Sequence, residues 1–427
     1  MINIVNKQDC CGCTACVQRC PKQCISLQGD EEGFLYPKVN VDDCIECGLC
    51  EKVCPVIHPY EKRIPLHTFA AINNDEEIRM QSSSGGVFTL IAEKVIDDGG
   101  VVFGARFDEK WQVVLDYTET KDGLAAFRGS KYVQARIEDT YKQCEKFLKE
   151  ERKVLYSGTP CQISGLKHFL RKEYDNLLTV DFVCHGVPSP KAWRKYLSEL
   201  TSKEFVQQIS MRAKNRGWKD FSFKVDYDKD KSALSFISLA TDNAYMKAFL
   251  SDLILRPSCH SCVAKECSSN SDITIADFWG IWEVNPAFYD DKGTSVVLIH
   301  NQKLEAFFKN LNLRYSKTSY EDVVKYNSAL VRSSRPHKYR KLFWTEFEET
   351  KSFSKLVSKH TFPRGLQAIK YVIKIILKKI VGGGKINALS LPSRINKQEI
   401  NSIYFREKRN SWKNYEVIIE LKIISNN

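Results

Sequence analysis

Long hydrophobic runs, glycine and proline are scarce in this sequence. No uninterrupted apolar segment approaches the roughly 18 residues that a membrane-spanning helix needs. Glycine and proline supply only 21 and 13 of the 427 residues, which excludes collagen-like and low-complexity chains. No basic stretch followed by an apolar one resembles a signal peptide. We therefore expect a cytoplasmic protein of about two or three globular domains.

Common nucleotide-binding and hydrolase signatures are absent as well. No G-x-G-x-x-G occurs, so the dinucleotide-binding fingerprint is missing. The run Gly382 to Lys385 is not a P-loop, because the first glycine is absent and Ile386 stands where Ser or Thr would bind magnesium. The sequence suggests no Ser-His-Asp or Cys-His nucleophile.

The positive charge is concentrated at one end. From His360 to Asn427 there are 13 basic and 4 acidic residues, so this segment carries +9 of the net charge of +12. The nearly neutral remainder argues against nucleic-acid binding, and the tail favours an anionic partner.

Cysteine is abundant, with 16 residues. In a reducing compartment this points to metal or redox chemistry. Two C-x2-C-x2-C-x3-C-P runs repeat in register, a spacing typical of a ferredoxin with two 4Fe-4S clusters, in which the last cysteine of each run binds the other cluster. We expect one cluster on Cys10, Cys13, Cys16 and Cys54, and another on Cys44, Cys47, Cys50 and Cys20.

The alternative of zinc is weaker, because zinc motifs pair two knuckles, whereas these runs have a three-plus-one pattern. Disulfides do not suit the expected compartment. Cys11 and Cys24 are left over and are predicted to be small apolar side chains near the clusters.

A second domain is predicted to begin near Leu66, with alternating strands and helices. Strands are expected over 67–72, 101–107, 112–117, 153–156, 177–183 and 271–277, and helices over 87–96, 137–150, 163–170 and 193–200. Cys161 and Cys184 would follow two of these strands, at the sheet edge where open α/β folds bind ligands.

The turn Ser82-Ser83-Ser84-Gly85-Gly86 precedes the first of these helices. Serines at such a position are a helix N-cap signal. The exposed backbone amides of a helix start also suit a phosphate group. Both interpretations remain open from the residues alone.

A further cysteine group lies downstream. Cys259 and Cys262 form a C-x2-C pair, and Cys267 follows. With Cys161 and Cys184 they offer enough thiols for another cubane, while a zinc knuckle or inert buried thiols are the alternatives.

These residues, together with Gly129-Ser130-Lys131-Tyr132, Gly158-Thr159-Pro160 and Asp277-Phe278-Trp279-Gly280, resemble the family of coenzyme F-420 hydrogenase/dehydrogenase beta subunits over about residues 66–340. The whole chain is similar to bacterial members fused to a ferredoxin domain, which are often found alongside cell-surface polysaccharide genes. The chlorophyll reductases of plants are more distantly similar.

The resemblance implies a bound FAD and a third 4Fe-4S cluster. The implied cluster ligands are Cys161, Cys184, Cys259 and Cys262, with Cys267 as a substitute for Cys184 or idle. The implied flavin residues are Ser82, Ser83, Ser84, Gly85, Gly86, Ser130, Lys131, Gly158, Thr159 and Pro160. The implied electron partner is reduced coenzyme F-420 or a ferredoxin.

We therefore expect an α+β protein: a two-cluster ferredoxin domain (1–60), an α/β flavin- and iron–sulfur-binding domain (66–340) and a basic, partly helical tail (341–427). It would be an oxidoreductase that exchanges hydride with the deazaflavin or reduces an organic substrate, for example in polysaccharide biosynthesis. The alternative is a non-catalytic subunit that relays electrons to a partner reductase.

The tail contains an amphipathic pattern. Lys370, Lys374 and Lys378 share one helical face opposite apolar residues. Such a helix either lies on an anionic membrane surface or docks on the protein with its lysines in water.

Overall fold

The computed structural model describes residues 1–201, 205–229, 232–362, 403–410 and 414–421. The chain divides into two compact units, Met1–Thr361 and Phe362–Asn427. In the second unit, β14 (Ile403–Asn410) and β15 (Asn414–Leu421) form an antiparallel hairpin. The predicted basic helix around Lys374 lies outside the described residues.

The N-terminal region contains two short helices and one hairpin. They are α1 (Ala15–Arg19), α2 (Leu49–Lys52), β1 (Ile25–Gly29) and β2 (Leu35–Val39). Each helix follows the second cysteine of its run, after a left-handed residue: Thr14 (φ 57°) before α1 and Gly48 (φ 71°) before α2. The two cysteine runs therefore adopt the same local conformation, as their repeated spacing predicts.

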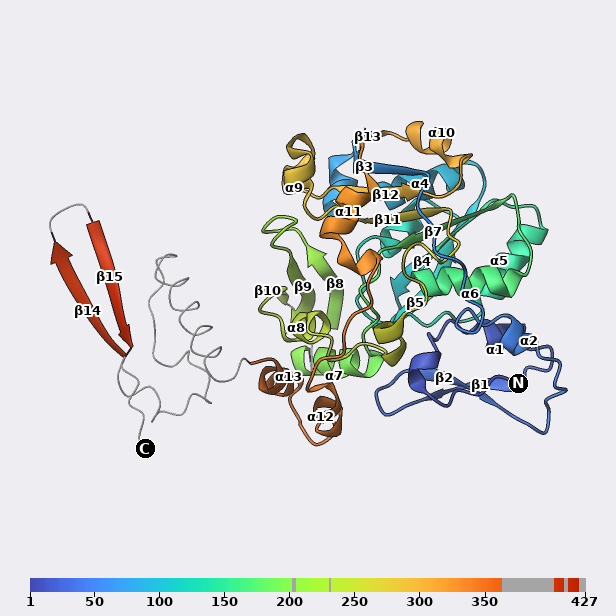
Figure 1. Cartoon of the computed structure of the whole chain (residues 1–427), viewed down its shortest axis with the longest axis horizontal. Coiled ribbons are helices and arrows are strands. Elements are labelled where there is room, and N and C mark those ends of the chain that lie inside the picture. Colours follow the sequence, from blue (N-terminus) through green and yellow to red (C-terminus); the bar gives the residue numbers. More distant parts are fainter. Residues whose placement is uncertain (202–204, 230–231, 363–402, 411–413, 422–427) are drawn as a thin grey trace. The chain divides into compact units, whose positions relative to one another are not determined.

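The body is built on an eight-stranded mixed sheet in the order β13-β3-β12-β11-β7-β6-β4-β5 (Figure 1). Its strands are β3 (His67–Asn73), β4 (Val101–Phe107), β5 (Val113–Thr118), β6 (Val154–Gly158), β7 (Leu177–Phe182), β11 (Ile273–Asp277), β12 (Ser295–Ile299) and β13 (Leu313–Lys317). The pairings make β3, β4, β6, β7 and β11 run in one direction, against β5, β12 and β13. The chain segments that follow β6, β7 and β11 thus emerge at the same edge.

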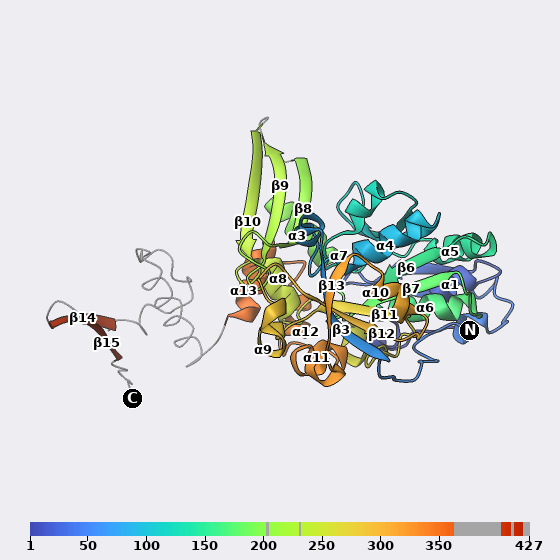
Figure 2. The same ribbon diagram turned by 90° about the horizontal axis from the view of Figure 1, so that it is seen from above.

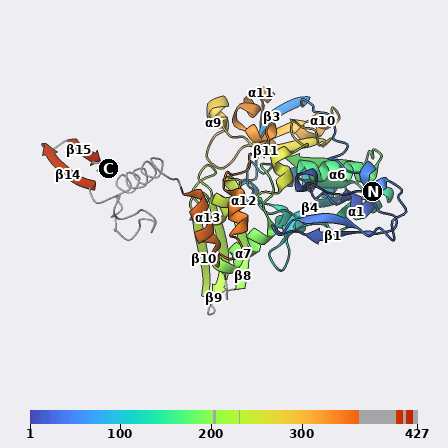
Figure 3. The same cartoon turned by 60° about the horizontal axis from the view of Figure 1, so that its bottom comes forward.

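Helices cover this sheet and connect its strands. They are α3 (Glu76–Gln81), α4 (Val87–Asp97), α5 (Thr140–Lys149), α6 (Pro160–Leu170), α9 (Ile281–Val284), α10 (Leu304–Lys309) and α11 (Tyr320–Tyr326). Apolar side chains of α4 pack with those of β3, β6 and β12 in one core cluster, and those of α5 and α6 pack with β4 and β6 in another. Figure 3 shows α1 of the N-terminal region beside α6.

A second, three-stranded antiparallel sheet projects from the body (Figure 2). It consists of β8 (Phe205–Ala213), β9 (Ser222–Lys229) and β10 (Ser232–Leu239). Its core is shared with α7 (Pro190–Leu200), α8 (Ala244–Leu250) and α13 (Phe353–Thr361), and α12 (Arg340–Thr345) adds Phe343. The compact unit therefore continues beyond residue 340, where the sequence suggested that the tail begins.

The strands expected from the sequence are present within a few residues, and α4 begins at Val87 as expected, whereas α5, α6 and α7 each begin three residues away from the expected start. The helix expected from Ile163 begins at Pro160, because Thr159 and Gln162 form a capping box and proline fits the first turn. At α4 the N-cap residue is Gly86 (φ 82°), without a side-chain cap. Of the two interpretations left open for this turn, the serine N-cap is thus not formed, because the serine hydroxyls bond elsewhere.

Candidate functional site

The two N-terminal cysteine runs line two separate cavities, and the last cysteine of each run lines the cavity of the other run. Cys10, Cys13 and Cys16 share one cavity with Cys54. Cys44, Cys47 and Cys50 share the other with Cys20. The structure thus gathers these eight cysteines in the two sets that the sequence spacing predicts.

The remaining predicted ligands line a third cavity. Cys161 lies in the first turn of α6, and Cys184 follows β7, so both stand at the edge where the parallel strands end. Cys259 and Cys262 face them from a 3-10 turn at Pro257–Ser261 and the residue after it. Here the structure brings together the thiols that the resemblance implies as a cluster site.

Two further cysteines touch this third cavity. Cys267 lines it, but its thiol also lies beside the hydroxyl of Tyr320. Cys11 lines both the third cavity and that of Cys10, and its thiol lies beside those of Cys13 and Cys161. Cys11 therefore lies directly between the two sites.

Some of the thiols are in surroundings that disfavour charge. Burial raises the pKa of Cys16 to about 12 and that of Cys184 also to about 12. A hydrogen bond from Cys11 and burial likewise raise the pKa of Cys161. These groups ionise at neutral pH only when a metal stabilises the thiolate, which is how coordinating cysteines behave.

The cysteines surround cavities instead of one point. A zinc ion would need four ligand atoms at about 2.0–2.3 Å from a single centre. Among the described residues, no group of three or more His, Cys, Asp or Glu side chains is placed to hold one metal ion. The all-cysteine donor sets and the three-plus-one spacing of the runs fit a 4Fe-4S cubane.

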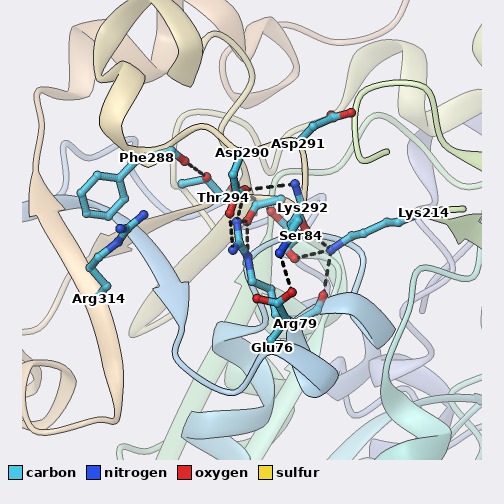
Figure 4. Close-up of polar contacts among 12 residues, drawn as sticks. Glu76, Arg79, Ser84, Lys214, Phe288, Asp290, Asp291, Lys292, Thr294 and Arg314 are labelled. Carbon is cyan, nitrogen blue, oxygen red and sulfur yellow. Dashed lines mark hydrogen bonds and ion pairs between the residues drawn. The ribbon is translucent and has the colours of Figure 1, made fainter. Parts of the chain in front are cut away.

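The predicted flavin turn is rigidly held by a polar network (Figure 4). Lys214 Nζ donates to the carbonyls of Arg79, Ser84 and Lys292 at 2.8, 2.7 and 2.6 Å. Arg79 in turn binds both carboxylate oxygens of Asp290 at 2.8 and 2.6 Å. The turn is therefore built before any ligand arrives.

The hydroxyls of the turn bond to protein groups. Ser82 Oγ donates to the Ile78 carbonyl, and Ser84 Oγ donates to the Thr294 carbonyl. Ser83 Oγ lies 2.9 Å from Ser130 Oγ and accepts the Ser130 N–H at 2.7 Å. The structure thus joins the Ser82–Gly86 and Ser130 segments, which the resemblance assigns to one flavin.

The other predicted flavin residues are Lys131 and the segment Gly158–Pro160, which are placed by other contacts. Lys131 Nζ donates to the carbonyls of Ala126 and Arg128 at 2.7 and 2.9 Å. Desolvation lowers the pKa of this half-buried amine to about 7, while the two carbonyls favour its charged form. Gly158–Pro160 joins β6 to α6, and Pro160 lines the third cysteine cavity.

An arginine beside the turn was not recognised in the sequence. Arg212 is buried and pairs with Asp277 at 2.8 and 3.1 Å, at the end of β11. It also donates to Tyr132 Oη at 3.2 Å and to the Ser83 carbonyl at 3.3 Å. Its Nε is buried without a hydrogen-bond partner among the described residues, which leaves one donor for a ligand.

Aromatic rings surround this arginine. The guanidinium lies 4.2 Å from the Phe221 ring centre and 5.6 Å from that of Trp279. Trp279 stacks on Trp218 at 4.9 Å with an interplanar angle of 3°. The tetrapeptide Asp277-Phe278-Trp279-Gly280 was the available sequence signal, but it does not reveal an arginine on another strand.

Two family models cover most of the body. Both are described as "Coenzyme F-420 hydrogenase/dehydrogenase, beta subunit": residues 68–140 match the model of its N-terminal part, and residues 151–322 match that of its C-terminal part. The chain belongs to this family. Residues 9–57 match a 4Fe-4S dicluster domain, which supports iron–sulfur binding in the N-terminal region.

Two relatives carry the same resemblance over part of their length. The coenzyme F-420-dependent sulfite reductase of Methanocaldococcus jannaschii is 28% identical over 216 residues, 49% of this chain and 33% of that protein. One subunit of the F(420)H(2) dehydrogenase of Methanosarcina mazei is 23% identical over 168 residues, 37% of this chain and 48% of that protein. The chain thus spans about a third to a half of these relatives.

Two further comparisons concern the N-terminal region and a solved structure. A ferredoxin of Mycolicibacterium smegmatis is 36% identical over 75 residues, 17% of this chain and 65% of that protein. A chain of the F-420-reducing nickel–iron hydrogenase complex from Methanosarcina barkeri aligns at a TM-score of 0.42 and 15% identity, over 76% of this chain and 96% of that one.

Among the described residues, no helix is long and apolar enough to cross a membrane. The family matches make the chain a member of the coenzyme F-420 hydrogenase/dehydrogenase beta-subunit family that also contains a 4Fe-4S dicluster region.

Proposed function

We propose that this protein is an iron–sulfur flavoprotein oxidoreductase with three 4Fe-4S clusters and one FAD. The observation that carries the proposal is the presence of three cysteine-lined cavities in one compact unit, the first and third of which share Cys11. The proposed ligand sets are Cys10, Cys13, Cys16 and Cys54; Cys20, Cys44, Cys47 and Cys50; and Cys161, Cys184, Cys259 and Cys262.

The proposed flavin site is the Ser82–Gly86 turn with Ser130, Lys131 and Gly158–Pro160. When bound, a flavin supplies the exchange between two-electron hydride chemistry and one-electron carriers. The residues of the chain position it: Lys214 fixes the turn, and the unpartnered Nε of Arg212 offers a buried charged donor to a flavin oxygen.

The proposed electron partners follow from the family. Reduced coenzyme F-420 or a ferredoxin would be the donor, and an organic molecule, such as a polysaccharide precursor, the acceptor where the deazaflavin is not made. We further propose a cytoplasmic protein that binds no nucleic acid and whose basic tail contacts an anionic membrane surface.

A second candidate is an electron-transfer subunit without a substrate of its own. The relative from Methanosarcina mazei is named as a subunit, which favours this alternative. Such a subunit would hold its clusters without binding free FAD tightly.

An anaerobic visible-spectrum titration of the reconstituted full chain separates the candidates. FAD is supplied, excess is removed, and reduced F-420 and then reduced ferredoxin are added. We expect retained flavin whose absorbance bleaches with reduced F-420. Bleaching with ferredoxin alone rejects the deazaflavin as donor, and clusters that bleach without any retained flavin support the relay subunit.

A further inference from the structure

Arg256 crosses from the body of the protein to the loop that carries Cys10. The residue precedes the turn of Cys259 and is fully buried. Its Nε donates to the Cys10 carbonyl at 2.8 Å, and its Nη2 lies 3.6 Å from the Cys10 sulfur. The same side chain therefore contacts both the backbone and the thiol of a proposed cluster ligand.

The remaining donors of this guanidinium tie further segments together. Nη2 donates to the Leu35 carbonyl and Nη1 to Gln134 Oε1, each at 3.0 Å. Gln134 Nε2 in turn donates to the Cys11 carbonyl at 3.3 Å. The approach is so close that a Cβ at Gly12 (φ 73°) would stand 2.9 Å from Arg256 Nη1. Only glycine fits there.

The charge of Arg256 has no carboxylate partner. The acceptors of its hydrogen bonds among the described residues are carbonyl or amide oxygens and the Cys10 sulfur. Its outer faces are covered by Tyr36 at 4.2 Å and Phe34 at 5.4 Å from the ring centres. A buried cation without a counter-ion is costly, so the site requires a negative charge beside it. The thiolate of Cys10 is the group in position to supply it.

The backbone of the same residue reaches the other cysteine set. The Cys259 N–H donates to the Arg256 carbonyl at 2.9 Å. Arg256 thus touches a ligand of the first cavity with its side chain and a ligand of the third cavity with its carbonyl. No comparable contact joins the cavity of Cys20 to that of Cys161 among the described residues.

We propose that Arg256 is a positioning residue that stabilises the reduced form of the cluster at Cys10 and holds it as the direct electron partner of the cluster at Cys161. This inference rests on the proposed function, because it requires both clusters. In each transfer one electron leaves one cluster and enters the other, with no proton or bond change. The cluster at Cys20 is then the outer carrier, and Cys47 in its ligand set is exposed.

The physical reason is electrostatic. A positive charge and a hydrogen bond at a ligand sulfur favour the form of a cluster that carries one more electron. Because the surroundings of Arg256 are dry, this effect is only weakly screened. Removal of the charge is expected to make the cluster at Cys10 harder to reduce.

The test is a potentiometric titration of the full-length holoprotein, followed by electron paramagnetic resonance. In Arg256→Met, the ratio of reduced to oxidised cluster at Cys10 is expected to fall at least tenfold at a fixed potential, a shift of about 59 mV for a one-electron couple. Arg256→Lys keeps the positive charge, so its cluster at Cys10 should have a potential close to that of the wild type. The signal is assigned by its loss in Cys54→Ser.

The matched control is Arg340→Gln. Arg340 pairs with Glu32 across the same boundary and donates to the Leu255 carbonyl, but its contacts include no cysteine. At a fixed potential, Arg340→Gln should change the ratio of reduced to oxidised cluster at Cys10 by less than twofold. An equal shift in Arg340→Gln and Arg256→Met would reassign the effect to domain docking and overturn the proposal.

Two other results overturn it as well. One is an unchanged potential in Arg256→Met with intact clusters, and the other is a shift confined to the signal that Cys20→Ser removes. If Arg256→Met does not fold, Arg256→Lys decides: it must keep the wild-type potential. If wild-type protein lacks three cluster signals, the proposed function fails before Arg256 is tested.

Discussion

Cys54 lines the same cavity as Cys10, although Cys20 is far nearer to Cys10 in the sequence and lines the other cavity. The crossing arises because α1 and α2 begin in the same way and pack against each other, so the cysteine after each helix points toward the other run. One lost thiol should therefore affect the cluster of the opposite run.

Serine at position 54 or 20 tests this crossing. Cys54→Ser should abolish the signal of the cluster held by Cys10, and Cys20→Ser that of the cluster held by Cys44. Each variant should lose roughly a third of the iron, since each removes one of the proposed cubanes. Paramagnetic resonance of the reduced variants, together with iron analysis, gives the result. Loss of the same signal in both variants would contradict the crossing.

Cys262 and Cys267 should respond differently to serine. Both line the third cavity, but the thiol of Cys267 also lies beside the hydroxyl of Tyr320. Cys262→Ser should lose the third cluster, whereas Cys267→Ser should keep it with unchanged iron content. An intact third cluster in Cys262→Ser, or loss of that cluster in Cys267→Ser, would contradict the assignment of Cys262 as the ligand. Cys144, a buried thiol of α5 that lines none of the three cavities, provides a control as Cys144→Ser.

Arg212 should be needed for FAD binding. Arg212→Met removes the donor next to Ser83 and is expected to weaken FAD binding at least tenfold, about 1.4 kcal/mol. It also leaves the half-buried Asp277 without its ion-pair partner, with the Trp218 indole N–H still bonded to it, which destabilises the fold by up to about 3–5 kcal/mol. The double variant Arg212→Met with Asp277→Asn relieves that charge.

Flavin fluorescence titrations and thermal unfolding of both variants separate the two effects. The double variant should regain stability without regaining FAD binding. If it binds FAD as the wild type does, Arg212 acts on the fold and has no part in the flavin site.

His300 should contribute to acid sensitivity. Its Nε2 lies 2.9 Å from Thr274 Oγ1, and burial lowers its pKa to about 3. In the unfolded chain His300 has a pKa near 6.5, so the contribution of neutral His300 to the stability of the fold is complete above that pH. It is lost as the pH falls toward 3, by at most about 1.4 kcal/mol per pH unit.

The check is the Tm of wild type and His300→Gln between pH 7.5 and about 4.5. The wild type should lose more Tm on acidification than the variant does. Parallel curves would contradict the assignment. The neighbouring Asp181 bonds the same hydroxyl and has a pKa raised to about 6 by burial, which opposes the effect equally in both proteins.

Sequence reasoning was most successful where chemistry restricts spacing. The C-x2-C-x2-C-x3-C-P runs predict both N-terminal ligand sets, and the structure groups them accordingly. Short continuous apolar runs predict β3 and β4, whose buried residues are consecutive, and an apolar stripe at helical spacing predicts α4, each within about a residue.

Long-range partners could not be predicted in this way. Arg256 meets Cys10, and Arg212 meets Asp277, through folding of distant segments, and a single arginine has no local pattern. The sheet of β8, β9 and β10 was missed because its burial alternates weakly along the strands. The serine N-cap, one of the two interpretations left open, is not formed because the hydroxyls of Ser82 and Ser84 bond backbone carbonyls instead of the N–H groups of α4.

The most direct measurement is the iron and acid-labile sulfide content of the anaerobically purified full chain, joined to its paramagnetic resonance spectrum after stepwise reduction. Three cubanes predict about twelve iron and twelve sulfide per chain, and three reducible signals. About eight of each with only two signals would leave the cavity of Cys161 and Cys184 without a cluster and contradict the central proposal.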